Sequence, residues 1–255
     1  MTHEPFSQGM YGGIYIYAHG VSKGPGLARS HKRIFAARAQ NRHDPSRFPR
    51  PGPMNAPSPS LGDAFDRLGV PDQVRGMIVE RHGEPHRHYH TLRHIDLMLR
   101  QIPKDTAFSR EMIAATLFHD IVYDPTRSDN EDLSLEIFLS VADLLAPGTP
   151  LDRALVSDMI LATESHHFRG QDMPRDVAID ILLKADLSIL WQPDAQIYAW
   201  YAQGVRQEYA FVPEAQFRVA RTRILTALRD DLVASGQLTP DQTEALRRNT
   251  EWELG

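Results

Sequence analysis

Apolar residues recur at helical spacing from about residue 61 to the C-terminus, and this period constrains the fold more than any other feature of the sequence. Leu61, Phe65 and Leu68 begin the pattern, Gly and Pro residues interrupt it, and no segment alternates strictly as a half-buried strand would. We therefore predict an all-α fold, a helical bundle. The expected helices cover residues 61–68, 71–78, 88–102, 108–123, 128–145, 151–166, 174–190, 197–209 and 216–232, with a short last helix from residue 239.

The first 60 residues differ from the rest, because they are rich in Gly, Pro and basic side chains and show no sustained period. Such a composition buries too little apolar surface to offset the entropy lost on ordering. We expect a disordered, basic extension over residues 1–60 and a single domain over residues 61–255. Met54 lies just before the helical pattern and leaves two interpretations open, a natural start at Met54 or a basic regulatory tail.

The bulk composition narrows the functional classes. A net charge of -5 over 255 residues argues against broad electrostatic binding to nucleic acid, which only the basic extension favours. The absence of cysteine excludes disulfides and thiolate metal ligands. No apolar run approaches the roughly 18 residues of a membrane-spanning helix, and no secretory signal is recognisable. We expect a cytoplasmic protein with no membrane partner.

Histidine is unusually frequent, with 12 residues, and several of them cluster between residues 82 and 94. His90 and His94 are four residues apart, so they are expected on one face of a helix, one turn from each other. This spacing permits joint metal binding, since imidazole is the commonest metal ligand among side chains. A polar helix face in a His-rich stretch explains the same pattern.

Two further places carry ionisable groups within apolar helices. His119 and Asp120 follow Leu117 and Phe118 at the end of an expected helix, and a metal ion would compensate the cost of burying this pair. Asp186 lies in a helix that is apolar almost all round. An unpaired buried Asp needs a cation, which a metal ion or a nearby basic side chain would supply.

Two helix ends carry signals with competing interpretations. One histidine of the pair His166 and His167 faces the same cavity as the preceding residues, or the pair interacts with the dipole of the helix it ends. Ser128 and Glu131 fit a capping box at the start of the helix 128–145, with Glu131 reaching back to the cap amide. Residues 239–242 give a second capping signal for the last helix.

Taken in order, these residues resemble the HD-domain metal-dependent phosphohydrolases. That family has a His, a His-Asp pair and an Asp on successive helices, which here matches His94, His119, Asp120 and Asp186. His90-x-x-x-His94 resembles the family's first helix, in which the second histidine is the ligand. The segments 87–90, 118–125, 129–132 and 183–187 resemble a subgroup of predicted HD phosphohydrolases, and the resemblance covers roughly residues 61–250.

The resemblance implies an HD-like domain that holds one divalent metal ion through His94, His119, Asp120 and Asp186. Two imidazoles and two carboxylates suit Mn, Fe, Co, Ni, Zn or Mg. Such an ion leaves positions for a water and a substrate oxygen, lowers the pKa of the water and polarises the phosphoryl group. The expected reaction is hydrolysis of a phosphate ester, and the resemblance implies a nucleotide or another small phosphorylated metabolite as substrate.

The candidate catalytic residues are Asp120, Glu131, His166 and His167. For Glu131 the capping role competes with acid–base catalysis, which an acidic residue in the corresponding stretch performs in some HD enzymes. His166 or His167 would position the substrate phosphate or donate a proton.

The candidate substrate-binding residues are Arg93, Lys184 and His90, and Arg87 and Arg127 are further phosphate partners. Arg93 is preferred among the basic residues because it lies beside His94 in the sequence. Each basic residue is nevertheless more often a solvated surface charge.

Two rival functions stay open. HD-fold oxygenases bind two irons but use additional histidines between the His-Asp pair and the last Asp, where this chain offers only His166 and His167. A catalytically silent HD module would keep the metal and sense a nucleotide. Core packing is the expected role of four aromatic residues, with a pocket or a homodimer surface as the alternative; they are Trp191, Tyr198, Trp200 and Tyr201.

Overall fold

The computed structural model describes residues 59–255, and in this part of the chain every regular element is a helix, which confirms the all-α prediction. Residues 1–58 lie outside the described residues. They include nearly all of the extension predicted for residues 1–60 and the alternative start at Met54. The α-helices are α1 (Pro59–Arg67), α2 (Asp72–Arg81), α3 (Leu92–Leu99), α4 (Ser109–Phe118), α5 (Asn130–Val141), α6 (Arg153–Ser165), α7 (Pro174–Asp186), α8 (Ala195–Glu208), α9 (Glu214–Ala234) and α10 (Pro240–Leu254). Two 3-10 turns, η2 (Ala142–Leu144) and η3 (Leu187–Trp191), extend α5 and α7.

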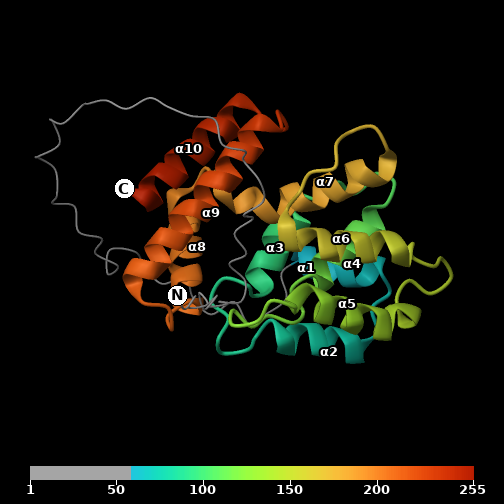
Figure 1. Cartoon of the computed structure of the whole chain (residues 1–255). Helices are drawn as coiled ribbons and strands as arrows, with labels where there is room; N and C mark the ends of the chain where they lie inside the picture. Colours follow the sequence, from blue (N-terminus) through green and yellow to red (C-terminus); the bar gives the residue numbers. More distant parts are fainter. Residues whose placement is uncertain (1–58) are drawn as a thin grey trace, which may run out of the picture.

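Helix α4 is the centre of the first core, which α1 to α7 form together (Figure 1). Nearly all of its side chains are buried, and it packs against α3, α5, α6 and α7. A helix that is apolar all round is stable only when neighbours surround it. Phe118 at its end meets Phe138 of α5 edge to face, with ring centroids 5.6 Å apart. The rigid end of α4 is where the His-Asp pair follows.

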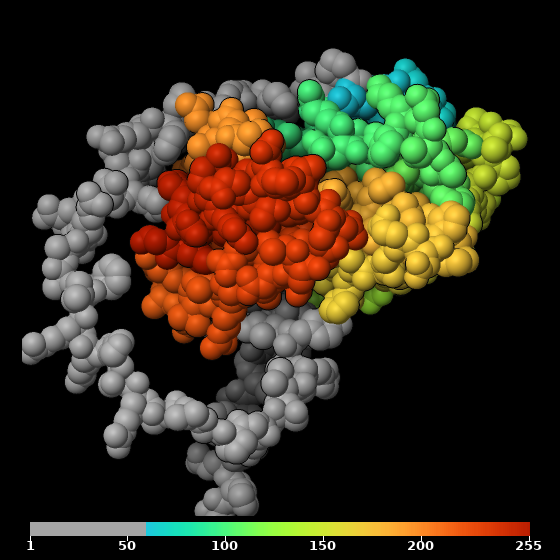
Figure 2. All heavy atoms as spheres, turned by 90° about the horizontal axis from the view of Figure 1, so that it is seen from above, coloured from blue at the N-terminus to red at the C-terminus, as the bar shows by residue number. Residues whose placement is uncertain are grey.

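Helices α8, α9 and α10 form a second core with η3, drawn in orange and red beside the first core in Figures 1 and 2. Tyr89, which precedes α3, belongs to this second core and packs edge to face on Tyr201 of α8. Arg93 of α3 lies over the ring of Trp200, 4.0 Å from its centroid. The two cores therefore meet along the segment that leads into α3.

The segment before α3 departs from the predicted helix 88–102, because α3 begins only at Leu92, with Thr91 as its N-cap. The backbone N–H groups of residues 88, 89 and 90 donate to the buried Glu208 carboxylate instead of to helical carbonyls. The prediction that His90 and His94 share a helical face is therefore wrong. Their rings nevertheless lie together, edge to face, with centroids 5.7 Å apart.

Helices α4 and α7 end earlier than predicted, and both of these ends carry candidate ligands. Helix α4 ends at Phe118, so His119 and Asp120 lie in the turn after it. In this turn the Arg87 guanidinium donates hydrogen bonds to the backbone carbonyls of residues 120 and 121. Helix α7 stops at Asp186 and continues as the 3-10 turn η3. In both cases a chemically important carboxylate lies at a helix end, where the chain changes direction.

The two capping signals have opposite outcomes. Thr239 and Gln242 form the predicted capping box of α10. The box predicted for Ser128 and Glu131 is wrong, because α5 begins at Asn130 and its N-cap is Asp129. Asn130 instead exchanges hydrogen bonds with the backbone of residue 124. These bonds hold the first residue of α5, which begins two residues later than predicted.

Core packing is confirmed for Trp191, Tyr198 and Tyr201, which are buried in the second core, whereas Trp200 is only partly buried under Arg93. Among the described residues, no helix combines the length and the apolar character that a membrane crossing requires.

Candidate metal centre

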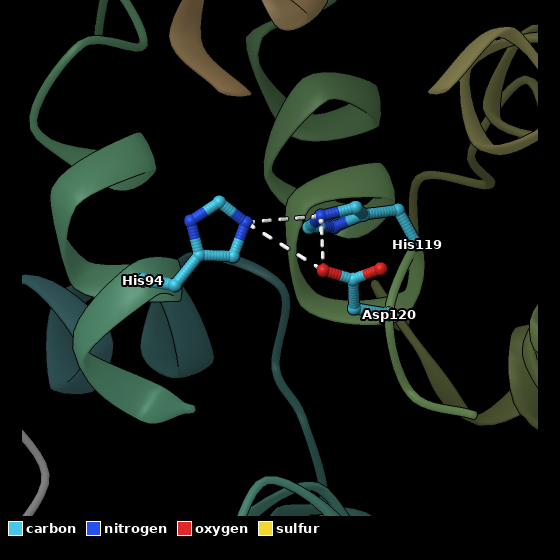
Figure 3. Close-up of side chains that lie close together, drawn as sticks. All are labelled: His94, His119 and Asp120. Atoms are coloured by element: carbon cyan, nitrogen blue, oxygen red, sulfur yellow. Dashed lines mark hydrogen bonds and ion pairs between the residues drawn. The ribbon is translucent and has the colours of Figure 1, made fainter. Parts of the chain in front are cut away.

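Four predicted ligands, His94, His119, Asp120 and Asp186, meet at the inner ends of three helices. His94 lies on the first turn of α3, His119 and Asp120 follow α4, and Asp186 ends α7. The side chains of the first three point toward one another in Figure 3. Both imidazoles are buried, whereas the carboxyl side chains keep 14% and 13% of their surface exposed. The centre is therefore closed on its histidine side and open on its carboxylate side.

The spacing of the ligand atoms matches that of a metal coordination shell. His119 Nε2 lies 3.0 Å from Asp120 Oδ2 and 3.3 Å from His94 Nε2. Asp186 Oδ1 lies 3.2 Å from His94 Nε2 and 3.9 Å from His119 Nε2, and Asp120 Oδ2 lies 3.6 Å from His94 Nε2. Metal bonds of about 2.1 Å place neighbouring ligand atoms roughly 3.0–3.4 Å apart and opposite ones about 4.2 Å apart. The ligand atoms of His94, His119 and Asp120 all lie within 4.8 Å of one another and could hold one ion, whereas Asp186 lies beside the two imidazoles without belonging to that set.

The orientation of the His119 ring is fixed by a hydrogen bond on the side opposite the other ligands. Its Nδ1 lies 3.1 Å from the Thr116 carbonyl, which can only accept, so Nδ1 carries the proton of the neutral ring. Its Nε2 then has the lone pair that a metal ion needs. Burial lowers the pKa of His119, but the Asp120 and Asp186 carboxylates outweigh burial and raise it to about 9. Without an ion, the centre attracts a proton.

The other ligands feel the same competition between burial and charge. Burial lowers the pKa of His94, although Asp186 and Asp120 act in the opposite direction. Burial alone would raise the pKa values of Asp120 and Asp186, yet the surrounding imidazoles hold both well below the usual range of a carboxyl group. Both carboxylates are therefore ionised at neutral pH and available to a cation.

His166 joins the centre through Asp186. His166 Nε2 lies 2.8 Å from Asp186 Oδ2, the oxygen that faces away from His94. The backbone of His166 ends α6 in the left-handed region, with φ 52°. Such a conformation is uncommon for a non-glycine residue and directs the ring back toward α7. His167 is exposed, and its catalytic role stays a prediction.

Glu131 lies half-buried on the first turn of α5. Burial raises the pKa of its carboxyl group, and the neighbouring charges of Asp120 and Glu164 raise it further. A hydrogen bond from its own backbone N–H acts in the opposite direction, but the net effect is a raised pKa. The capping box predicted with Ser128 is not formed, and the carboxyl group holds a proton more readily than usual.

His90 is held beside the centre by a residue that the sequence analysis did not single out, Glu208 of α8. His90 Nδ1 lies 2.8 Å from Glu208 Oε2, and the ring stacks on Tyr123 with centroids 4.1 Å apart. Glu208 could have been found by the argument applied to Asp186, because it continues the apolar stripe of Tyr201 and Val205 at helical spacing.

The basic residues are placed differently from one another. Arg93 packs on Trp200, and Lys184 Nζ donates to the Gln237 carbonyl in the turn before α10. Arg127 is exposed and pairs with Asp129. None of the described contacts brings Arg93, Lys184 or Arg127 to the four ligands, so their roles toward phosphate stay predictions. Arg87 is buried, and its donors are taken by protein acceptors.

The comparisons with known proteins add no relative: no family model, no curated protein and no solved structure matches this chain. The assignment of a function therefore depends on the geometry of the centre and on the resemblance of its motifs.

Proposed function

We propose that this chain is a metal-dependent phosphohydrolase of the HD type, which hydrolyses a phosphate ester of a small metabolite. The observation that supports the proposal most is the convergence of two imidazoles and two carboxylates, with neighbouring ligand atoms 3.0–3.9 Å apart. Their order along the chain is that of the HD motif. The proposal extends to one divalent ion as cofactor and to a small phosphorylated substrate as partner.

The donor set supports Mn, Fe, Co, Ni, Zn or Mg, because it combines borderline nitrogen with hard oxygen ligands. When bound, such an ion lowers the pKa of a water and polarises a phosphoryl oxygen. His94 and His119 would hold it from the buried side, and Asp120 and Asp186 from the side that solvent reaches. A substrate would approach over the two carboxylates.

The groups that border this open side support acid–base work. His166 holds the second oxygen of Asp186, and the charges of His90 and Glu131 are felt at Asp120 or feel its charge. A carboxyl group with a raised pKa, such as Glu131, is suited to donate a proton to a leaving oxygen. The choice of a nucleotide among phosphate esters is supported by the resemblance alone.

Metal content tests the central part of the proposal with a matched pair of variants on α7. Asp186→Asn removes a charge that faces the two imidazoles. Asp180→Asn removes a charge that is more deeply buried, whose partners are N–H groups of Arg169, Gly170 and Gln237. Purified without chelator or metal-affinity tag, the wild type and Asp180→Asn should hold about one equivalent of metal. Asp186→Asn should bind it at least about tenfold more weakly, as loss of an anionic ligand requires.

Equal metal content in all three proteins, or none in any of them after reconstitution, would contradict the metal centre. A screen of phosphate esters with the metal-loaded protein then tests the reaction, with Asp186→Asn as the blank. Two irons per chain would redirect the search to oxygenase substrates. Tight nucleotide binding without turnover across several metals would support a sensing module.

A further inference from the structure

The Tyr89 side chain lies against the metal centre, although it belongs to the second core. Its ring packs on that of His94, with centroids 4.8 Å apart and planes tilted by 45°. The rings of Tyr201 and Trp200 pack on it from α8, at centroid distances of 4.7 Å and 5.4 Å. These neighbours leave the residue only 4% exposed, so its side chain has a fixed position beside the centre.

The backbone of Tyr89 is held as firmly as its ring. Its N–H group donates to Glu208 Oε1 at 2.7 Å. Gly204 of α8 comes so near that a Cβ there would stand 3.0 Å from both the nitrogen and the Cβ of Tyr89. Real Cβ atoms rarely tolerate such contacts, so the glycine lets α8 approach. The Tyr89 hydroxyl is therefore positioned before any ligand arrives, which lowers the cost of binding one.

The Tyr89 hydroxyl differs in its bonding from two other buried tyrosine hydroxyls. That of Tyr123 donates to Glu208 at 2.9 Å, and that of Tyr198 donates to Glu253 at 2.6 Å. Buried tyrosines normally have such a partner. Within residues 59–255, by contrast, no protein group hydrogen-bonds to the Tyr89 hydroxyl. Its donor is therefore left for a ligand.

Solvent reaches the Tyr89 hydroxyl beside the carboxylates of the centre. In the described part of the chain, His82 Nε2 is the one fully enclosed side-chain nitrogen or oxygen without a partner, so the unpartnered Tyr89 hydroxyl is not fully enclosed. Burial raises the pKa of Tyr89 well above its usual value, and Asp186 is the neighbouring charge that raises it most. The Asp186 side chain is itself 13% exposed. Both groups therefore border the opening over the centre.

We propose that Tyr89 is a substrate-binding residue, whose hydroxyl donates a hydrogen bond to a phosphoryl oxygen of the substrate at the metal centre. The inference rests on the proposed phosphohydrolase function. A tyrosine hydroxyl keeps its proton at neutral pH and donates without any change of protonation. Phosphoryl oxygens carry negative charge, and hydrogen bonds to charged acceptors are the stronger ones. A neutral donor also adds no positive charge that would repel the metal ion.

Tyr89→Phe and Tyr198→Phe form a matched pair, because each removes one hydroxyl from a buried ring and nothing else. Tyr198→Phe takes a donor from Glu253, so it should lower the urea midpoint of the metal-free full chain. Tyr89→Phe breaks no protein hydrogen bond and keeps the ring against His94, so its midpoint should equal or exceed that of the wild type. A fall as large as that in Tyr198→Phe would reveal a partner within the protein and overturn the inference.

The second measurement is the affinity of the Mn²⁺-loaded full chain for inorganic phosphate, by calorimetry. Tyr89→Phe should hold as much Mn²⁺ as the wild type but bind phosphate about tenfold more weakly or worse, as loss of a hydrogen bond to a charged group requires. Tyr198→Phe should bind phosphate within about twofold of the wild type.

Two results would overturn the inference and leave the proposed function standing. The first is equal phosphate affinity in the wild type and Tyr89→Phe. The second is loss of Mn²⁺ from Tyr89→Phe, which would make Tyr89 a support of His94 instead of a substrate-binding residue. Absence of phosphate binding by the Mn²⁺-loaded wild type would instead count against the proposed function, and the inference would fall with it.

Discussion

Arg87 gives the sharpest test of how the turn after α4 is held. The sequence alone allowed a phosphate-binding role for it, whereas in the structure its guanidinium is buried and acts within the protein. One edge of the fork donates to the carbonyl of residue 120 at 2.7 Å and to those of residues 90 and 121 at 3.2 Å. Its Nε donates to Glu84 Oε2 at 3.0 Å. Arg87 thus ties the turn that carries Asp120 to the segment that carries His90.

The expected cost of Arg87→Ala follows from these contacts. Three carbonyls, of which that of residue 121 is buried and the other two partly buried, lose their donor at about 1 kcal/mol each, and Glu84 loses its closest charge partner. The guanidinium also lies over the Tyr123 ring, 5.5 Å from its centroid, which adds about 0.5–1 kcal/mol. We expect a loss of about 3–5 kcal/mol in the free energy of unfolding. Arg87→Lys should fall between, because an ammonium group cannot reproduce the planar fork.

Urea unfolding of the metal-free protein, followed by circular dichroism, measures this loss without involving the metal ion. Arg81→Ala is the control, because Arg81 also pairs with Glu84, at 3.5 Å, but its side chain keeps 42% of its surface exposed. Its removal should change the free energy of unfolding by less than about 0.5 kcal/mol. If Arg87→Ala lowers the free energy of unfolding by less than about 1 kcal/mol, or if both variants lower it equally, the structural role is refuted. A phosphate-binding role for Arg87 would then be favoured again.

Three further predictions follow from the titratable groups. The pKa of His119 is raised to about 9 from an ordinary 6.5, so this group stabilises the metal-free fold fully below pH 6.5. Urea titrations should show the free energy of unfolding fall by up to about 3 kcal/mol as the pH rises through 9. A rise in the free energy of unfolding over this range would contradict the pairing of His119 with the carboxylates. His82 is buried with Nε2 unpartnered, and burial lowers its pKa to about 3. The free energy of unfolding should therefore fall by about 3 kcal/mol between pH 6.5 and 4, and His82→Phe should remove this dependence on pH. Glu131→Gln should retain the metal but lower phosphatase turnover about a hundredfold, and unchanged turnover would exclude Glu131 as the acid.

The sequence predicted the parts of the site whose residues break the apolar pattern. Asp186 and the pair His119 and Asp120 stood out because ionisable groups in apolar helices need partners, and the structure brings both carboxylates close to His119 Nε2. The all-α class followed from the period alone. The helix ends were predicted less well. Glu208 and Arg87, which lie far away in the sequence, bind backbone groups there that would otherwise form helical hydrogen bonds.

Long-range partners also explain why other roles could not be assigned from sequence. Lys184 is close to Asp186 along the chain, yet its ammonium group binds the Gln237 carbonyl, 53 residues away. Glu208 lies 118 residues from His90, and no local spacing connects them. Local patterns reveal which groups need a partner, whereas only the packed structure shows which partner each of them has.

In the described part of the chain, Asp120 differs from the enclosed carboxylates of Asp180 and Glu208, and the difference argues for a cation at the centre. Asp180 and Glu208 accept N–H groups fixed by the backbone or by neighbouring side chains, so neither needs an ion. Asp120 faces His119 Nε2 at 3.0 Å, but the proton of the neutral ring is already used at Nδ1 on the Thr116 carbonyl. A lone pair and a carboxylate oxygen repel each other at that distance unless a proton or a metal ion lies between them. Metal binding at pH 7 should therefore release about one proton, which calorimetry in buffers of different ionisation enthalpy would measure, and binding without proton release would contradict this account.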